Sequence, residues 1–198
     1  MNKFILGAAA AAAVAFSISP AHAVEDYVEN NIQFKTGNSS ITFRKYTAGV
    51  DYNMVQLDTK LAGWGYTYRW TDSGGTVENR YRLTAPKIDL VGNFYLKPRT
   101  EIKTYESGAK DDFVNLQPII AADYEITDKL SAYIDLKPKF AVGSDKYSDG
   151  EFYESQNDFG IDYALSDALS VGVFYEYNTD GDGNKTDDFL GTSVVVKF

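Results

Sequence analysis

Apolar residues alternate with polar or small residues, at a period of two, from about residue 40 to the end of the chain. In the segment 188–198, Leu190 and Val196 fall on one face, and Gly191 and Lys197 fall on the other. This pattern is typical of β-strands that have one apolar face. No stretch after residue 23 is apolar over the 18 or more residues that a transmembrane helix needs. We therefore predict an all-β chain.

The alternating segments predict ten strands. Their expected ranges are 27–36, 40–57, 61–71, 76–85, 88–105, 112–126, 130–143, 152–165, 168–178 and 188–198. An even number of antiparallel strands can close into a barrel with both chain ends on the same side. Eight or twelve strands also fit, because the alternation is weakest over 27–57.

The connections between these segments fall into two classes that alternate along the chain. The short class comprises 57–61, 85–88, 126–130 and 165–169. The looser class, richer in Gly, Asp and Ser, comprises 36–40, 71–75, 106–111, 143–151 and 179–187. Outer-membrane barrels have short periplasmic turns and longer outside loops. The alternation therefore indicates a transmembrane antiparallel up-and-down β-barrel, about ten strands in size, over residues 24–198.

The first 23 residues have the features of a secretory signal peptide. Lys3 precedes an apolar run over 4–16, and Ala21 and Ala23 form the small-residue pattern that a signal peptidase recognises. A membrane anchor is the alternative, but this run is shorter than the roughly 20 residues that cross a bilayer. We predict export and cleavage after Ala23.

A soluble β-sandwich or lipocalin-like barrel is the competing fold, and it would turn the apolar faces inward. The alternation of turns and loops and the many charges on the polar faces favour a membrane barrel instead. The final Phe198 resembles the C-terminal assembly signal of outer-membrane barrels in general. We therefore expect a protein of the bacterial outer membrane that is surrounded by lipid and lipopolysaccharide and is inserted by the barrel-assembly machinery.

If the apolar faces contact lipid, the polar faces line the lumen. The expected basic residues of the lumen are Arg69, Arg80, Arg82, Lys97, Arg99, Lys137 and Lys139. The expected opposing acidic wall consists of Asp158, Asp162 and Glu176. In one interpretation the two walls face each other across a narrow wet pore that attracts anions. In the other, the charges pair and fill the lumen, whose backbone radius would be roughly 9 Å, and the barrel has a structural or surface-interaction role without transport.

Several short motifs resemble those of the small oligogalacturonate-specific porins. They are Tyr81-Arg82-Leu83, the Leu-x-Pro sequences at 96–98, 116–118 and 136–138, and the terminal Phe. The resemblance implies a twelve-stranded pore for acidic oligosaccharides that is lined by arginines. It also implies that Arg80, Arg82, Lys97 and Arg99 lie along an anion path.

Composition argues against several other functions. The formal net charge of −9 is unfavourable for binding nucleic acid. The single histidine, His22, lies in the signal segment, so the mature chain lacks the general base that outer-membrane hydrolases use. The chain has no cysteine, which excludes a disulfide and a lipoprotein anchor. We expect neither an enzyme nor a bound cofactor.

One acidic segment, Asp180-Gly181-Asp182-Gly183-Asn184, begins like a calcium-binding loop. It departs from that pattern at Lys185, where the turn glycine belongs, and it lacks a glutamate at the twelfth position. We expect an acidic outside loop and predict no metal site there.

Overall fold

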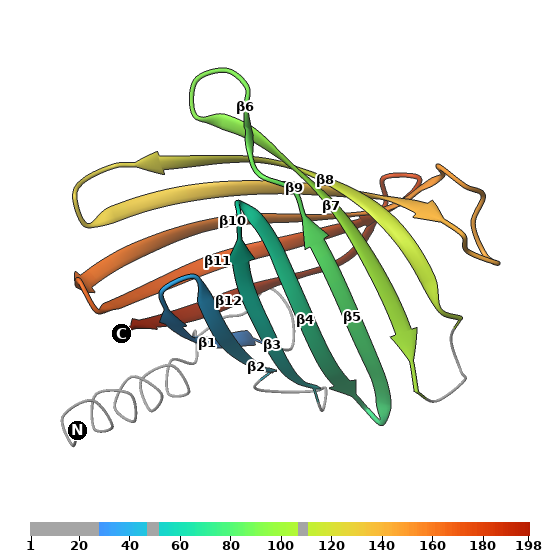
Figure 1. The fold of residues 1–198 in the computed structure, drawn as a ribbon, viewed down its shortest axis with the longest axis horizontal. Coiled ribbons are helices and arrows are strands. Elements are labelled where there is room, and N and C mark those ends of the chain that lie inside the picture. The colour runs from blue at the N-terminus through green and yellow to red at the C-terminus, as the bar shows by residue number, and fades with distance from the viewer. Residues whose placement is uncertain (1–27, 47–51, 107–110) are drawn as a thin grey trace.

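The computed structural model describes residues 28–46, 52–106 and 111–198 (Figure 1). The expected signal peptide, 1–23, lies outside the described residues. So do the middle of the expected strand 40–57 and most of the expected loop 106–111. No helix long and apolar enough to cross a membrane occurs in the described part of the chain.

Among the described residues, eleven strands close into a β-barrel, which confirms the prediction of an all-β barrel of about ten strands. The barrel strands are β1 (Val28–Thr36), β2 (Ser39–Tyr46), β3 (Tyr52–Leu61), β4 (Trp64–Ser73), β5 (Thr76–Thr84), β7 (Phe94–Tyr105), β8 (Phe113–Glu125), β9 (Leu130–Val142), β10 (Phe152–Ser166), β11 (Leu169–Asp180) and β12 (Lys185–Lys197). Neighbours in the sequence pair antiparallel, and β5 pairs with β7. The barrel closes between β1 and β12, which run parallel.

The count differs from ten because the expected strand 40–57 is two strands. β2 and β3 pair antiparallel, with Phe43 opposite Val55 and Lys45 opposite Asn53. The odd-numbered side chains Phe43 and Leu57 are exposed on the outer face on both sides of this reversal, whereas Met54 is buried inside. Odd-numbered residues therefore face outward on both strands. Because the period-two pattern continues without a break, the sequence alone does not reveal the turn.

A second difference concerns the expected strand 88–105. Its first part is a short separate strand, β6 (Ile88–Asp89), which folds back onto the start of β7. Gly92, with a φ of 61°, lies in the turn between them. In Figure 1 this hairpin projects beyond the barrel rim. The sequence pattern missed it because the hairpin also carries exposed apolar residues, such as Leu90 and Val91.

The two ends of the barrel carry different connections. At one end, here called the turn end, lie Phe198 and the connections after β1, β3, β5, β8 and β10. Phe198 donates its backbone N–H to the carbonyl of Lys35 (3.0 Å) at this end. At the other, the loop end, lie the connections after β4, β7, β9 and β11. The segment 36–40, expected among the outside loops, is the β1–β2 turn and lies at the turn end. With eleven strands, β1 begins at the loop end and β12 finishes at the turn end.

The apolar faces of the strands point outward and the polar faces point inward, which suits a membrane barrel. Many large apolar or aromatic side chains are exposed on the outer face, and they come from eight of the eleven described barrel strands: Phe43, Leu57, Tyr66, Tyr81, Leu83, Ile102, Leu116, Ile120, Phe159, Ile161, Tyr163 and Val173. The buried side chains of the inner face are largely polar or charged, among them Glu29, Arg69, Glu78, Arg82, Glu101, Lys103, Asn115, Gln117, Lys139 and Glu176. The molecule is therefore apolar outside and polar inside.

Small residues inside the barrel make room for large ones. The ring of Tyr133 on β9 lies against Gly160 on β10, and the ring of Phe174 on β11 lies against Gly191 on β12. A Cβ atom at either glycine would overlap the ring opposite. These glycines therefore let aromatic side chains lie flat against the inner wall.

Candidate functional site

The inner face of β4, β5 and β7 carries a cluster of four arginines: Arg69, Arg80, Arg82 and Arg99. Register brings them together, because Arg69 on β4 is directly opposite Arg80 on β5. On β5, Arg82 is two residues from Arg80 and therefore points to the same side. Arg99 on β7 is opposite Thr84 on β5, one inward position further along. All four of these arginines were expected in the lumen from the sequence.

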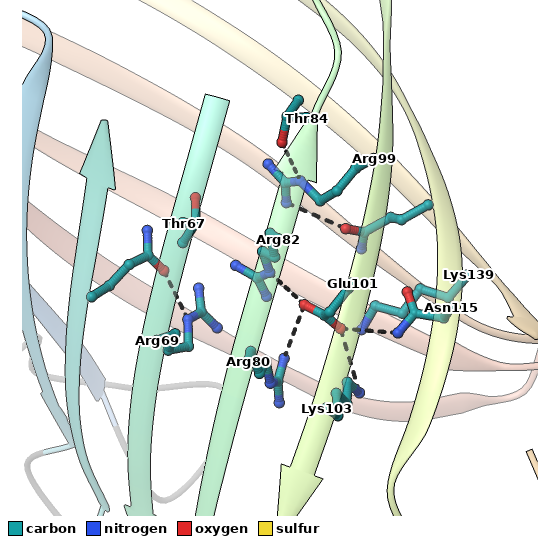
Figure 2. A network of polar contacts seen from close by, with 12 residues as sticks. Thr67, Arg69, Arg80, Arg82, Thr84, Arg99, Glu101, Lys103, Asn115 and Lys139 are labelled. Atoms are coloured by element: carbon teal, nitrogen blue, oxygen red, sulfur yellow. Dashed lines mark hydrogen bonds and ion pairs between the residues drawn. The ribbon is translucent and has the colours of Figure 1, made fainter. Parts of the chain in front are cut away.

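One acid, Glu101 on β7, lies at the centre of this cluster (Figure 2). Its Oε2 forms an ion pair with Nε of Arg82 and lies 4.0 Å from Nη1 of Arg80. Its Oε1 accepts a hydrogen bond from Nδ2 of Asn115 (3.1 Å) and lies 3.7 Å from Nζ of Lys103. The Glu101 side chain is completely buried. Three cations and one amide thus share a single carboxylate.

A second acid, Glu78 on β5, binds the same cluster from the loop end. It forms an ion pair with Nε of Arg80, and its Oε2 accepts a hydrogen bond from the hydroxyl of Tyr105 (2.8 Å). Glu78, Glu101 and Lys103 were not among the residues singled out from the sequence. Their inward direction follows from the alternation with Arg80 and Arg99, but nothing in the sequence indicates which of these charges meet.

Two arginines of the cluster are held by neutral groups alone. Arg69 donates from Nε to the side-chain carbonyl of Gln56 (2.8 Å), and its side chain is more than nine-tenths buried. Arg99 donates to the hydroxyl of Thr84 (3.0 Å) and to the side-chain carbonyl of Gln117 (3.3 Å). Among residues 28–46, 52–106 and 111–198, no carboxylate lies within ion-pair distance of either arginine.

The cluster therefore has more positive than negative charge. Four arginines and Lys103 face two acids, Glu78 and Glu101. A charged group removed from water is costly when it lacks a counter-ion. The guanidinium groups of Arg69 and Arg99 therefore keep a positive charge that no described carboxylate within ion-pair distance neutralises.

The other basic residues expected in the lumen have partners nearby. On β9, Lys137 forms ion pairs with Asp158 of β10 and with Asp135 (3.6 Å), and Lys139 forms an ion pair with Glu154 of β10. On β7, Nζ of Lys97 lies 4.9 Å above the centre of the Tyr95 ring.

The three acids expected to form an opposing wall lie on β10 and β11, and two of them contact polar side chains of their own or a neighbouring strand. Asp158 binds Lys137, its neighbour on β9. Glu176 accepts hydrogen bonds from the side-chain amides of Gln156 (2.7 Å) and Asn178 (2.9 Å). Asp162 lies beside Gly172 of β11.

A further buried ion pair lies on the side of the barrel where the chain closes. Glu29 on β1 is completely buried, and its Oε1 lies 2.9 Å from Nε of Arg44 on β2. The Nε of Arg44 also donates to the side-chain oxygen of Asn31 (2.8 Å). This pair was not expected from the sequence, because the alternation over 27–57 is weak.

Buried side chains line part of the inner wall, and a cavity lies toward each end of the barrel. Next to Glu101 on the inner wall, the side chains of Asn115, Gln117 and Ile119 on β8 are almost completely buried. Toward the loop end lies a cavity of about 650 Å³, whose lining includes Arg80, Lys103, Tyr147 and Tyr153. Toward the turn end lies a cavity of about 350 Å³, whose lining includes Lys35, Asp162 and Lys197. The two cavities share no lining residue.

In the acidic loop at 180–184, backbone and side-chain amides bind the carboxylate of Asp180. Asp180 accepts hydrogen bonds from the backbone N–H groups of Asp182 (3.0 Å) and Asn184 (2.9 Å), and from the side-chain amide of Asn184 (3.2 Å). The described ranges contain no group of three or more His, Cys, Asp or Glu residues placed to hold a metal ion.

No protein-family model, curated protein or solved structure matches this chain.

Proposed function

We propose that this protein is a β-barrel of the bacterial outer membrane that forms a narrow pore with a preference for small anions. An apolar outer face suits lipid, and a polar inner face suits water and ions. In this proposal lipid and lipopolysaccharide surround the barrel, and the barrel-assembly machinery recognises the last strand, β12, together with Phe198, which follows it.

The observation that carries the anion preference is the excess of arginine in the central cluster. Arg69 and Arg99 are bound by neutral groups, so their charge is available to an ion that passes. An uncompensated charge inside a low-dielectric wall acts more strongly than the same charge in bulk water. Such a lumen would favour inorganic anions. It would also favour acidic oligosaccharides, the solutes that the motif resemblance implies.

The expected conductance is small. The mid-height side chains leave little free space, so ions pass where long arginine and lysine side chains move aside. The cavities at the two ends would act as wide entrances to a short constriction. A pore of this form should admit small ions and thin solutes and exclude bulky ones.

The test is an electrical recording from the refolded mature protein in a planar lipid bilayer. Folding is checked first by the shift of the unheated band on a denaturing gel. The expected result is steady, small openings whose reversal potential under a KCl gradient lies toward the equilibrium potential of chloride. Folded protein that gives no openings over many insertions contradicts the proposal.

A filled barrel with a structural or surface-interaction role is the second candidate. The burial of Glu101, Asn115 and Gln117 at mid-height favours it, as does the pairing of Lys137 and Lys139 with acids on the neighbouring strand. A folded barrel that stays silent in the bilayer would support this role instead.

A further inference from the structure

Glu101 contacts three of the five cations that the four arginines and Lys103 contribute to this inner wall. Its two oxygens face Arg80, Arg82 and Lys103, which come from two adjacent strands. Asn115 on β8 fixes the carboxylate from the other side. Arg82 has no second acid within ion-pair distance among the described residues.

These contacts have two physical consequences. First, Glu101 cancels one unit of positive charge within the cluster. Second, it holds the ends of Arg82 and Lys103 along the wall between β5 and β8, as Figure 2 shows. Arg69 and Arg99, which Glu101 does not bind, keep their charge uncompensated. The selectivity of the lumen therefore depends on the balance between this one acid and the arginines around it.

We propose that Glu101 is a selectivity-determining residue of the pore: its buried carboxylate is the countercharge that limits the anion preference set by the arginine cluster. This inference rests on the proposed pore function and adds to it the residue that sets the size of the preference.

The test is the substitution Glu101→Gln. Glutamine has almost the same shape, and its single amide oxygen can still accept a hydrogen bond from Arg82 or from Asn115, but it carries no charge. The ratio of anion to cation permeability, measured from the reversal potential in dilute KCl, should rise roughly threefold or more, because a unit charge beside the ion path is weakly screened there. The rise should shrink in concentrated salt.

Two further variants separate charge from shape and from position. Glu101→Asp keeps the charge and shortens the side chain, so its permeability ratio should stay close to that of the unchanged protein. Asp89→Asn makes the same charge change on the exposed β6 hairpin, where Asp89 pairs with Lys87 (3.0 Å), and it should leave the ratio unchanged.

A charge-balanced pair keeps the test usable if Glu101→Gln alone does not fold. Arg82→Gln combined with Glu101→Gln removes one charge of each sign, so the net charge of the cluster stays that of the unchanged protein. The double variant should have a permeability ratio close to that of the unchanged protein, and a higher ratio than Arg82→Gln alone.

The outcomes separate the two proposals. If the unchanged barrel conducts and prefers anions, but Glu101→Gln has the same permeability ratio, the role of Glu101 is refuted and the pore remains. If the unchanged barrel and Glu101→Gln are both folded and silent, the pore itself is refuted, and the role of Glu101 falls with it.

Discussion

At the scale of single residues, the interior of this barrel is governed by the cost of burying charge. An ion pair inside a protein gains little over a well-packed apolar pair, but loss of one partner is expensive because the other stays buried and charged. Glu29 illustrates this clearly. Its side chain is completely buried, its Oε2 has no hydrogen-bond partner, and its Oε1 is 2.9 Å from Nε of Arg44.

We therefore predict that Arg44→Gln lowers the free energy of unfolding by about 3–5 kcal/mol. Urea unfolding of the protein in lipid vesicles, followed by the fluorescence of Trp64 and Trp70, measures the change. The matched control is Lys45→Gln, which removes the same charge from an exposed neighbour on β2 and should alter stability by about 0.5 kcal/mol or less. An Arg44→Gln variant as stable as the control would mean that the pair contributes nothing.

At the scale of elements, the parallel contact between β1 and β12 determines which connections share an end of the barrel. In the arrangement expected from the sequence, the connection at 36–40 lies outside with the acidic loop at 179–187. In the structure, Gly37 and Asn38 form the turn at the end of the barrel that also holds Phe198, and Asp182 lies at the other end. The two arrangements place Asn38 on opposite sides of a membrane.

Cysteine labelling of intact cells tests this difference, because the chain has no cysteine of its own. A membrane-impermeant maleimide should label Asp182→Cys. It should fail to label Asn38→Cys and Asp128→Cys, which lie at the turn end. All three sites are exposed in the folded barrel, so protection reflects the membrane rather than burial. Labelling of Asn38→Cys from outside would contradict the eleven-stranded arrangement.

The sequence predicted strands where alternation coincides with a visible turn signal. Strands β8 to β12 follow the expected ranges closely, for example 113–125 against 112–126. It merged β2 with β3 because the alternation keeps its phase across the reversal, so Phe43 and Leu57 share the outer face without a break. A pattern of period two records the face on which a residue lies, and it does not record the direction of the strand.

The same limit applies to the candidate site. Alternation was enough to predict that Arg69, Arg80, Arg82 and Arg99 point inward, given lipid outside. It could not predict that Glu101 would meet Arg82, because that contact depends on the register between β5 and β7. Whether the lumen is filled at mid-height also depends on such contacts between strands.

At the largest scale, the barrel is apolar outside and polar inside, and one inner wall carries more basic than acidic groups. The excess charge comes from groups that no carboxylate neutralises, above all Arg69 and Arg99. Removal of these two charges leaves no acid without its partner, since both side chains are held by neutral groups. The double substitution Arg69→Gln and Arg99→Gln therefore removes most of the excess positive charge of the wall and leaves its ion pairs intact.

The most direct measurement is the reversal potential of this double variant under a tenfold KCl gradient, beside the unchanged protein and Lys45→Gln. The unchanged barrel and Lys45→Gln should prefer chloride, and the double variant should lose most of that preference while it still conducts. If the double variant is folded and conducts with the same chloride preference as the unchanged protein, the arginine cluster does not set the selectivity, and the central claim is wrong.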